Sequence, residues 1–169
     1  VATTANVRNG GAIIDDGGYA ITIGQALLHS SIAGDNAIDS GLTKLGAGTL
    51  TLSSVNTFTG PITNRAGTLI LNAGSAYASD VAVYGGLLQI SSASSIQGST
   101  TVSNGATFTL VQVGSSTMTL KNLTLNGAAS GKGAVLGLTP GSGYNSSVPL
   151  VNCGTLTLNG TNTISLAAA

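Results

Sequence analysis

Short stretches in which apolar and polar residues alternate run along the chain and are separated by glycine-rich turns. An alternation with a period of two predicts a β-strand that buries one face and leaves the other in water. The clearest stretch returns twice at a constant spacing, as Gly48-Thr49-Leu50-Thr51-Leu52, Gly67-Thr68-Leu69-Ile70-Leu71 and Gly86-Leu87-Leu88-Gln89-Ile90. A second, shorter alternation lies about midway through each unit, around Ile62, Val81 to Val83 and Val102.

The fixed period points to stacked coils. None of the intervals has an apolar pattern at helical spacing, and turn formers such as Asn104-Gly105 and Asn126-Gly127 separate the strands. We therefore expect an all-β fold, a right-handed parallel β-helix with about 19–21 residues per coil and about seven to nine coils. The sequence itself does not determine the handedness. An antiparallel sandwich is the alternative, but it explains the regular return of one motif less well.

In such a stack, equivalent residues of successive units lie above one another. One inward column would hold Leu50, Leu69 and Leu88, and a second would hold Leu52, Leu71 and Ile90. The outward columns would be Thr49, Thr68 and Leu87, and Thr51, Ile70 and Gln89. After Gly105 the apolar positions shift by one residue to Phe108 and Leu110, which predicts a one-residue bulge. The unit then returns as Gly154-Thr155-Leu156-Thr157-Leu158.

We expect one domain over residues 1–169 that falls into four parts. Less regular N-terminal coils would occupy residues 1–40, and regular repeats residues 41–112. Irregular coils with longer loops would follow over residues 113–153, and a terminal coil over residues 154–169.

Charge is scarce and balanced, with five Lys or Arg and five Asp or Glu residues among 169. Binding to nucleic acid depends on cationic stripes that neutralise phosphates, so we expect no nucleic-acid partner. No apolar run approaches the length that a membrane-spanning helix needs, and we expect no membrane insertion by this segment. The single cysteine, Cys153, reads as a small buried residue, with a reactive or intermolecular thiol as the alternative.

Candidate catalytic chemistry is sparse. The chain has no Glu, and its acids are Asp15, Asp16, Asp35, Asp39 and Asp80. Asp15, Asp16 and Asp80 read as turn residues, whereas Asp35 and Asp39 share a polar loop in which they meet at one surface or are solvated. His29 has no second His or Cys nearby, so we expect it at a loop or coil edge. We predict no catalytic residue, no cofactor and no metal site.

Other side chains that could mark a ligand surface are scattered along the sequence. The cations Lys44, Arg65, Lys121 and Lys132 do not form a stripe, and the aromatic residues do not share the period of the repeat: Tyr19, Tyr77, Tyr84, Tyr144 and Phe58. We expect the aromatics to be packed singly at surfaces or turns. A carbohydrate or protein ligand of the surface is left open.

The run from Gly41 to Ser53, followed by Asn56-Thr57-Phe58-Thr59-Gly60 and Ala66-Gly67-Thr68-Leu69, resembles the autotransporter-associated β-strand repeat, also called the passenger-associated transport repeat. The likeness is close over about residues 41–72, looser through Leu110 and partial near Gly154 to Leu166. It implies a parallel β-helix in the exported passenger of a secreted or outer-surface bacterial protein, without catalytic residues to transfer. Asn64 departs from the family, which more often has a small aliphatic residue there, so we expect its amide to be satisfied locally or by stacking.

Three functions follow from these expectations. The favoured one is a non-enzymatic structural segment, a rigid stalk of an extracellular or cell-surface adhesin. The second is a protomer of an extracellular filament that stacks end to end, because both Val1 to Ala5 and Ser165 to Ala169 lack charged caps. On either reading the chain continues in a larger polypeptide or associates with itself. The third is a carbohydrate-active enzyme, which the scarcity of acids disfavours.

Overall fold

The computed structural model describes residues 4–91, 93–114, 116–129, 131–141, 147 and 149–167. Val1 to Thr3, Tyr144, Ala168 and Ala169, on which some of the expectations above rest, lie outside these residues. All seventeen strands pair in parallel, and a single antiparallel bridge joins Ala128 to Thr161 in the described part of the chain.

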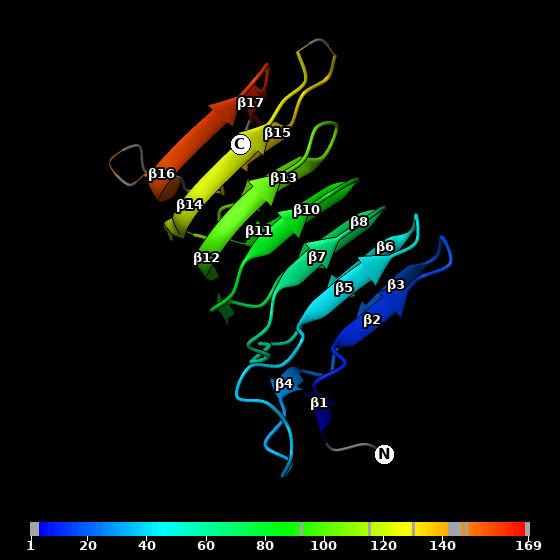
Figure 1. The fold of residues 1–169 in the computed structure, drawn as a ribbon. Helices are drawn as coiled ribbons and strands as arrows, with labels where there is room; N and C mark the ends of the chain where they lie inside the picture. The colour runs from blue at the N-terminus through cyan, green and yellow to red at the C-terminus, as the bar shows by residue number, and fades with distance from the viewer. Residues whose placement is uncertain are drawn as a thin grey trace.

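The chain winds as a stack of coils whose strands form two long sheets and a shorter third face (Figure 1). The first sheet contains, in spatial order, β16 (Val151–Asn159), β14 (Met118–Asn126), β12 (Ser95–Val102), β10 (Val81–Val83), β7 (Ile62–Asn64), β5 (Leu42–Leu45) and β2 (Ala12–Asp15). The second contains β17 (Thr163–Leu166), β15 (Val135–Thr139), β13 (Thr107–Val111), β11 (Leu87–Ser91), β8 (Thr68–Leu71), β6 (Thr49–Leu52) and β3 (Ala20–Ile23). On the third face β1 (Ala5–Val7) pairs with β4 (Leu27–His29), and β9 (Ala76–Tyr77) pairs with the first half of β12.

This arrangement confirms the parallel β-helix. Seven strands along each long sheet correspond to seven coils in the described residues, at the lower end of the expected range. With about 4.8 Å between neighbouring strands, the stack is about 30 Å long. None of the described residues forms a helix with the length and apolar character needed to cross a membrane.

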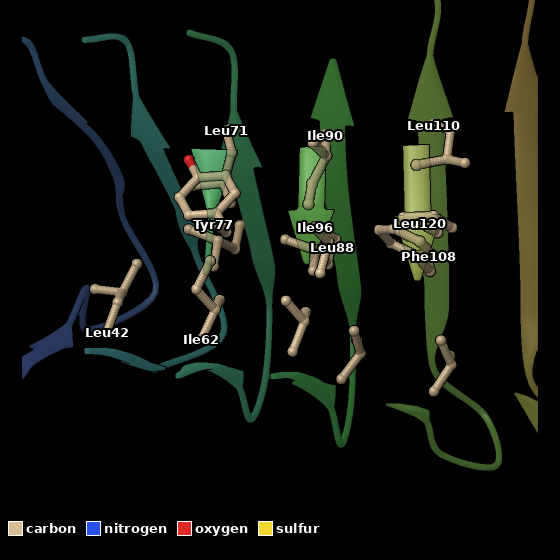
Figure 2. Packing of buried hydrophobic residues seen from close by; sticks show 14 of the residues in the cluster. Leu42, Ile62, Leu71, Tyr77, Leu88, Ile90, Ile96, Phe108, Leu110 and Leu120 are labelled. Atoms are coloured by element: carbon tan, nitrogen blue, oxygen red, sulfur yellow. The ribbon is translucent and has the colours of Figure 1, made fainter. Parts of the chain in front are cut away.

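The predicted columns are present with the predicted register. Leu50 lies opposite Leu69 and Leu69 opposite Leu88, and all three are fully buried. The second inward column and both outward columns pair as expected: Leu52 with Leu71 and Ile90, Thr49 with Thr68 and Leu87, and Thr51 with Ile70 and Gln89. The apolar side chains of the coils fill the space between the sheets as one continuous cluster (Figure 2).

The apolar positions do shift by one residue at Phe108, but the prediction of a bulge in the strand is wrong. Leu87 to Ser91 pair with Thr107 to Val111 without interruption. The additional residue lies instead in the preceding turn, where Ala106 N donates to Ser103 O at 3.0 Å and Gly105 has a φ of +77°. A register shift does occur in β12, between Ile96 and Ser99, where the strand passes from the third face into the first sheet.

The placement of the Gly154–Leu158 motif is also corrected. The sequence pattern groups it with Leu50 and Leu69, but Leu156 pairs with Leu123 of β14 and therefore belongs to the first sheet. The last strand of the second sheet is β17, in which Ile164 pairs with Leu136. Both sheets use the same alternation, so the motif alone does not distinguish them.

Coil length varies more than the sequence predicts. The coil from Leu50 to Leu69 has the expected length, but the coils from Ile21 to Leu50 and from Leu123 to Leu156 are more than half as long again. The additional residues lie in the connections between strands, so they leave the register of the core unchanged.

Candidate functional site

A polar cluster fastens the second coil to the third. The Asp39 carboxylate is buried, and its Oδ2 lies 2.8 Å from His29 Nδ1. Thr59 Oγ1 lies 3.1 Å from the same histidine nitrogen and donates to Asp39 Oδ2 at 3.1 Å. The backbone N–H groups of Gly41, Thr59 and Gly60 donate to the carboxylate at 2.8–2.9 Å. Asp39 is therefore not a solvated loop residue.

The cluster does not have the geometry of a nucleophilic triad. In a triad the acid binds one ring nitrogen of the histidine and the nucleophilic hydroxyl binds the other. Here Asp39 and Thr59 both contact Nδ1 of His29. Burial raises the pKa of Asp39, but the N–H donors of Thr59, Gly60 and Gly41 and the contact with His29 outweigh it and hold the pKa below the ordinary value. This arrangement suits a stabilising carboxylate.

Asp35, the second acid of this loop, has separate partners. Its Oδ2 accepts from Arg8 Nε at 2.8 Å and from the hydroxyl of Ser30. The bond to Arg8 lowers the pKa of Asp35. The two loop carboxylates thus serve different neighbours and do not form the paired acids that glycoside hydrolysis uses.

A buried ion pair joins the first two coils. Lys44 Nζ lies 2.7 Å from Asp16 Oδ2, and both side chains are fully inaccessible to water. Lys44 also donates to the carbonyl oxygens of Leu45, Gly46 and Ala66, each at 3.0 Å. Its hydrogen bond lowers the pKa of Asp16. Asp16 lies in the predicted turn. Lys44, one of the cations that the sequence shows to be too scattered for a stripe, points into the core.

Asn64 occupies the inward position next to Lys44 in the adjacent strand. Its Nδ2 donates to Gly85 O at 2.9 Å and Leu87 O at 3.2 Å, so the nitrogen of the amide is satisfied locally, as predicted. The buried Oδ1 has no hydrogen-bond partner among the described residues, so the prediction holds for only half of the amide. Lys44 and Asn64 therefore have similar roles one coil apart, because each donates hydrogen bonds to backbone carbonyl oxygens at the turns between the two sheets.

A ladder of small polar residues follows one inward column of the third face. Asn56 Oδ1 accepts from Leu27 N at 3.0 Å, Asn56 N donates to Ser75 Oγ at 3.0 Å, and Ser75 N donates to Ser94 Oγ at 3.3 Å. Asn56, Ser75 and Ser94 follow one another at the period of the repeat. That spacing was visible in the sequence, although the ladder itself was not predicted.

The remaining candidates lie apart from these clusters. Asp15 accepts from Gly17 N at 3.0 Å in the predicted turn, and Asp80 accepts from Ser99 N at 2.7 Å. Cys153 is half-buried, with Sγ 3.2 Å from Thr155 O. Among the described residues, no three of His, Cys, Asp or Glu gather as metal ligands.

The aromatic residues divide between core and surface. Phe58 and Tyr77 are buried and pack with ring centroids 5.7 Å apart, which corrects the expectation that they are isolated at surfaces or turns. Tyr19 and Tyr84 are exposed, as expected, and Arg65 lies 5.5 Å from the centre of the Tyr84 ring.

The last coil leaves inward-facing residues open to water. Leu156 and Leu158 of β16 and Ile164 and Leu166 of β17 are 47–67% exposed, although their counterparts in the central coils are fully buried. No further coil in the described part of the chain lies above them.

Comparison with known protein families finds a repeat in the same part of the chain as the sequence pattern does. The model of the passenger-associated-transport-repeat matches residues 42–64 and 66–90. No curated protein and no solved structure matches the chain. The first matched segment spans β5 to β7 and the second spans β8 to β11, so each includes strands of both long sheets. Residues 42–64 and 66–90 are thus each similar to one passenger-associated-transport-repeat, in agreement with the resemblance found in the sequence.

Proposed function

We propose that this chain is a non-enzymatic structural segment, a rigid β-helical stalk in a secreted or surface-exposed bacterial protein of the adhesin type. One observation carries the proposal: a single apolar cluster runs from Val7 to Leu136 through coils held in parallel register. Such a core resists bending because each coil contacts its neighbours along the sheets. The Asp16–Lys44 pair and the hydrogen bonds of Asp39 to Thr59 and Gly60 also join successive coils at their turns.

Spin labels on an outward column test the stalk. Thr43 and Thr124 are aligned through Thr63, Ala82 and Thr101, four inter-strand steps that amount to about 19 Å. With Cys153 replaced by Ser, labels at Thr43→Cys and Thr124→Cys should give one narrow distance distribution by pulsed electron paramagnetic resonance.

Removal of one whole coil, residues 67–85, should shorten that distance by about 5 Å and preserve cooperative unfolding. Removal of residues 67–76 alone takes half a coil and should abolish the fold. A broad distribution, or no shortening after removal of the whole coil, would refute a rigid stalk.

The alternative role, a filament protomer, is favoured by the exposed Leu156, Leu158, Ile164 and Leu166 of the last coil. An open row of inward residues and unpaired strand edges is a template for a further coil. Sedimentation over a range of concentrations distinguishes the roles. Fibres in the unmodified chain that disappear in Leu158→Lys support the filament, and a persistent monomer contradicts it.

A further inference from the structure

The outer face of the first sheet carries a hollow where its threonine column is interrupted. Thr63 and Thr101 flank Ala82 on neighbouring strands, and Ala82 has neither the hydroxyl nor the additional methyl of its neighbours. The resulting hollow spans β7, β10 and β12 and has a volume of about 330 Å³. Six of the lining residues define its character: Pro61, Thr63, Asp80, Ala82, Tyr84 and Thr101. Its size is at the lower end of the range for ligand sites, about 300–1,000 Å³.

Tyr84 provides an exposed aromatic surface beside this hollow. The side chain follows β10 and is 57% exposed, although a ring of this size normally gains from burial. The guanidinium of Arg65 lies 5.5 Å from its centroid and restrains the ring, while Arg65 itself is not among the lining residues. The ring is thus held in place beside the hollow.

The polar groups around the hollow suit hydroxyl partners. Thr63 and Thr101 contribute hydroxyls that both donate and accept hydrogen bonds. Asp80 Oδ1 accepts from Ser99 N at 2.7 Å, which fixes the carboxylate at the rim. Asp80 is the one charged residue among those that line the hollow, so the site accepts hydrogen bonds from hydroxyls and repels anions.

We propose that this hollow binds a neutral pyranose unit of an extracellular polysaccharide. The apolar face of the sugar would lie against Tyr84, above Ala82, and its hydroxyls would meet Asp80, Thr63 and Thr101. The Asp80 carboxylate, the one charge in the lining, makes the site less favourable for an acidic sugar than for a neutral one. This inference goes beyond the stalk role, because it gives the rod a ligand on one face.

Affinity electrophoresis of the full chain in gels that contain dextran, mannan or galactan tests the site, with polygalacturonate as the charged comparison. We expect at least one neutral polysaccharide to retard the protein. Tyr84→Ala should weaken the apparent affinity about tenfold, since it removes both the stacking contact and its buried area. Ala82→Ile should have a similar effect because it fills the floor of the hollow.

Tyr19→Ala is the matched control, since Tyr19 is 76% exposed on a different part of the molecule and should leave binding unchanged. Asp80→Asn keeps the shape and the acceptor for Ser99 N, and it should weaken binding to the neutral sugar less than Tyr84→Ala does. Thermal unfolding checks that each variant folds. The proposal is overturned if no neutral polysaccharide retards the chain, if Tyr84→Ala binds normally, if Tyr19→Ala loses as much, or if only polygalacturonate binds.

Discussion

Replacement of Leu71 by Ala tests whether the stacked leucines carry the stability of the fold. Leu71 belongs to a column that continues through Ile90, Leu110 and Leu138 to Leu166. Leu71 is completely buried in the middle of the stack, whereas Leu166 is 67% exposed in the last coil. The same substitution at the two positions therefore compares one column with and without a covering coil.

The expected magnitudes follow from burial. Transfer of a fully buried leucine side chain contributes about 1.5–3 kcal/mol, and the cavity left by Leu71→Ala raises the loss to about 3–5 kcal/mol. Leu166 has only about a third of its surface covered, so Leu166→Ala should cost less than about 1 kcal/mol.

Urea unfolding measures both effects. With a slope of about 2 kcal/mol per molar, the midpoint should fall by about 1.5–2.5 M for Leu71→Ala and by less than about 0.5 M for Leu166→Ala. The slopes should be compared too, because an unequal slope would mean that coils unfold separately. Equal losses at the two positions would refute the view that coil-on-coil coverage stabilises this column.

Three further changes address the buried polar groups and the turns. Lys44→Met should lower the melting temperature strongly, because it leaves the Asp16 carboxylate buried without its cation. Adding Asp16→Asn should restore part of this decrease. If the effects of the two substitutions simply add in the double-mutant cycle, the ion pair does not contribute as assigned. The pKa of Asp39 is lowered in the folded chain, so its contribution is complete above the ordinary aspartate value of about 3.9 and is lost as pH falls below it. Asp39→Asn should accordingly flatten the decline in stability as the pH falls below about 4, and an unchanged decline would contradict the assigned role. Gly67→Ala should lower the melting temperature far more than Gly105→Ala. Both glycines have a positive φ, but only at Gly67 would the new Cβ lie 2.3 Å from a backbone oxygen, that of Gly48. Similar decreases in melting temperature would show that backbone strain alone governs these turns.

The residues of the core could be predicted from the sequence because two independent periods, one along each strand and one from coil to coil, select the same residues. The alternation along each strand selects the inward residues, and the regular return of the motif aligns Leu50 with Leu69 and Leu88. The lengths of the outer coils could not be predicted in this way. Their additional residues lie in connections that have no apolar period, and the long coil from Leu123 to Leu156 leaves the pairing undisturbed.

The polar interior was harder to predict for a different reason. A lysine in an alternating strand normally lies in water, because burial of a charge is costly unless it has partners. The partners of Lys44 are Asp16, which lies a whole coil earlier in the chain, and three carbonyls exposed by the turns of the fold. None of these contacts has a local sequence signal. The hollow beside Tyr84 likewise depends on the absence of one side chain, at Ala82, between two strands.

The polar contacts solve a problem that the leucine columns create. Because successive coils bear nearly the same apolar residues, a shift of one coil would restore most of the hydrophobic contacts, and the core alone would specify register weakly. The Asp16–Lys44 pair distinguishes the correct register from the shifted one. If the coils shifted by one, β7 would take the place of β5 beside the first coil, and Asn64 would stand where Lys44 stands now. Asp16 would then be left without a cation. The cluster around Asp39 also occurs at one level only, where it joins residues 39–41 to Thr59 and Gly60. These groups therefore contribute most to the choice between registers, and their loss should favour misaligned coils even where the remaining core is intact.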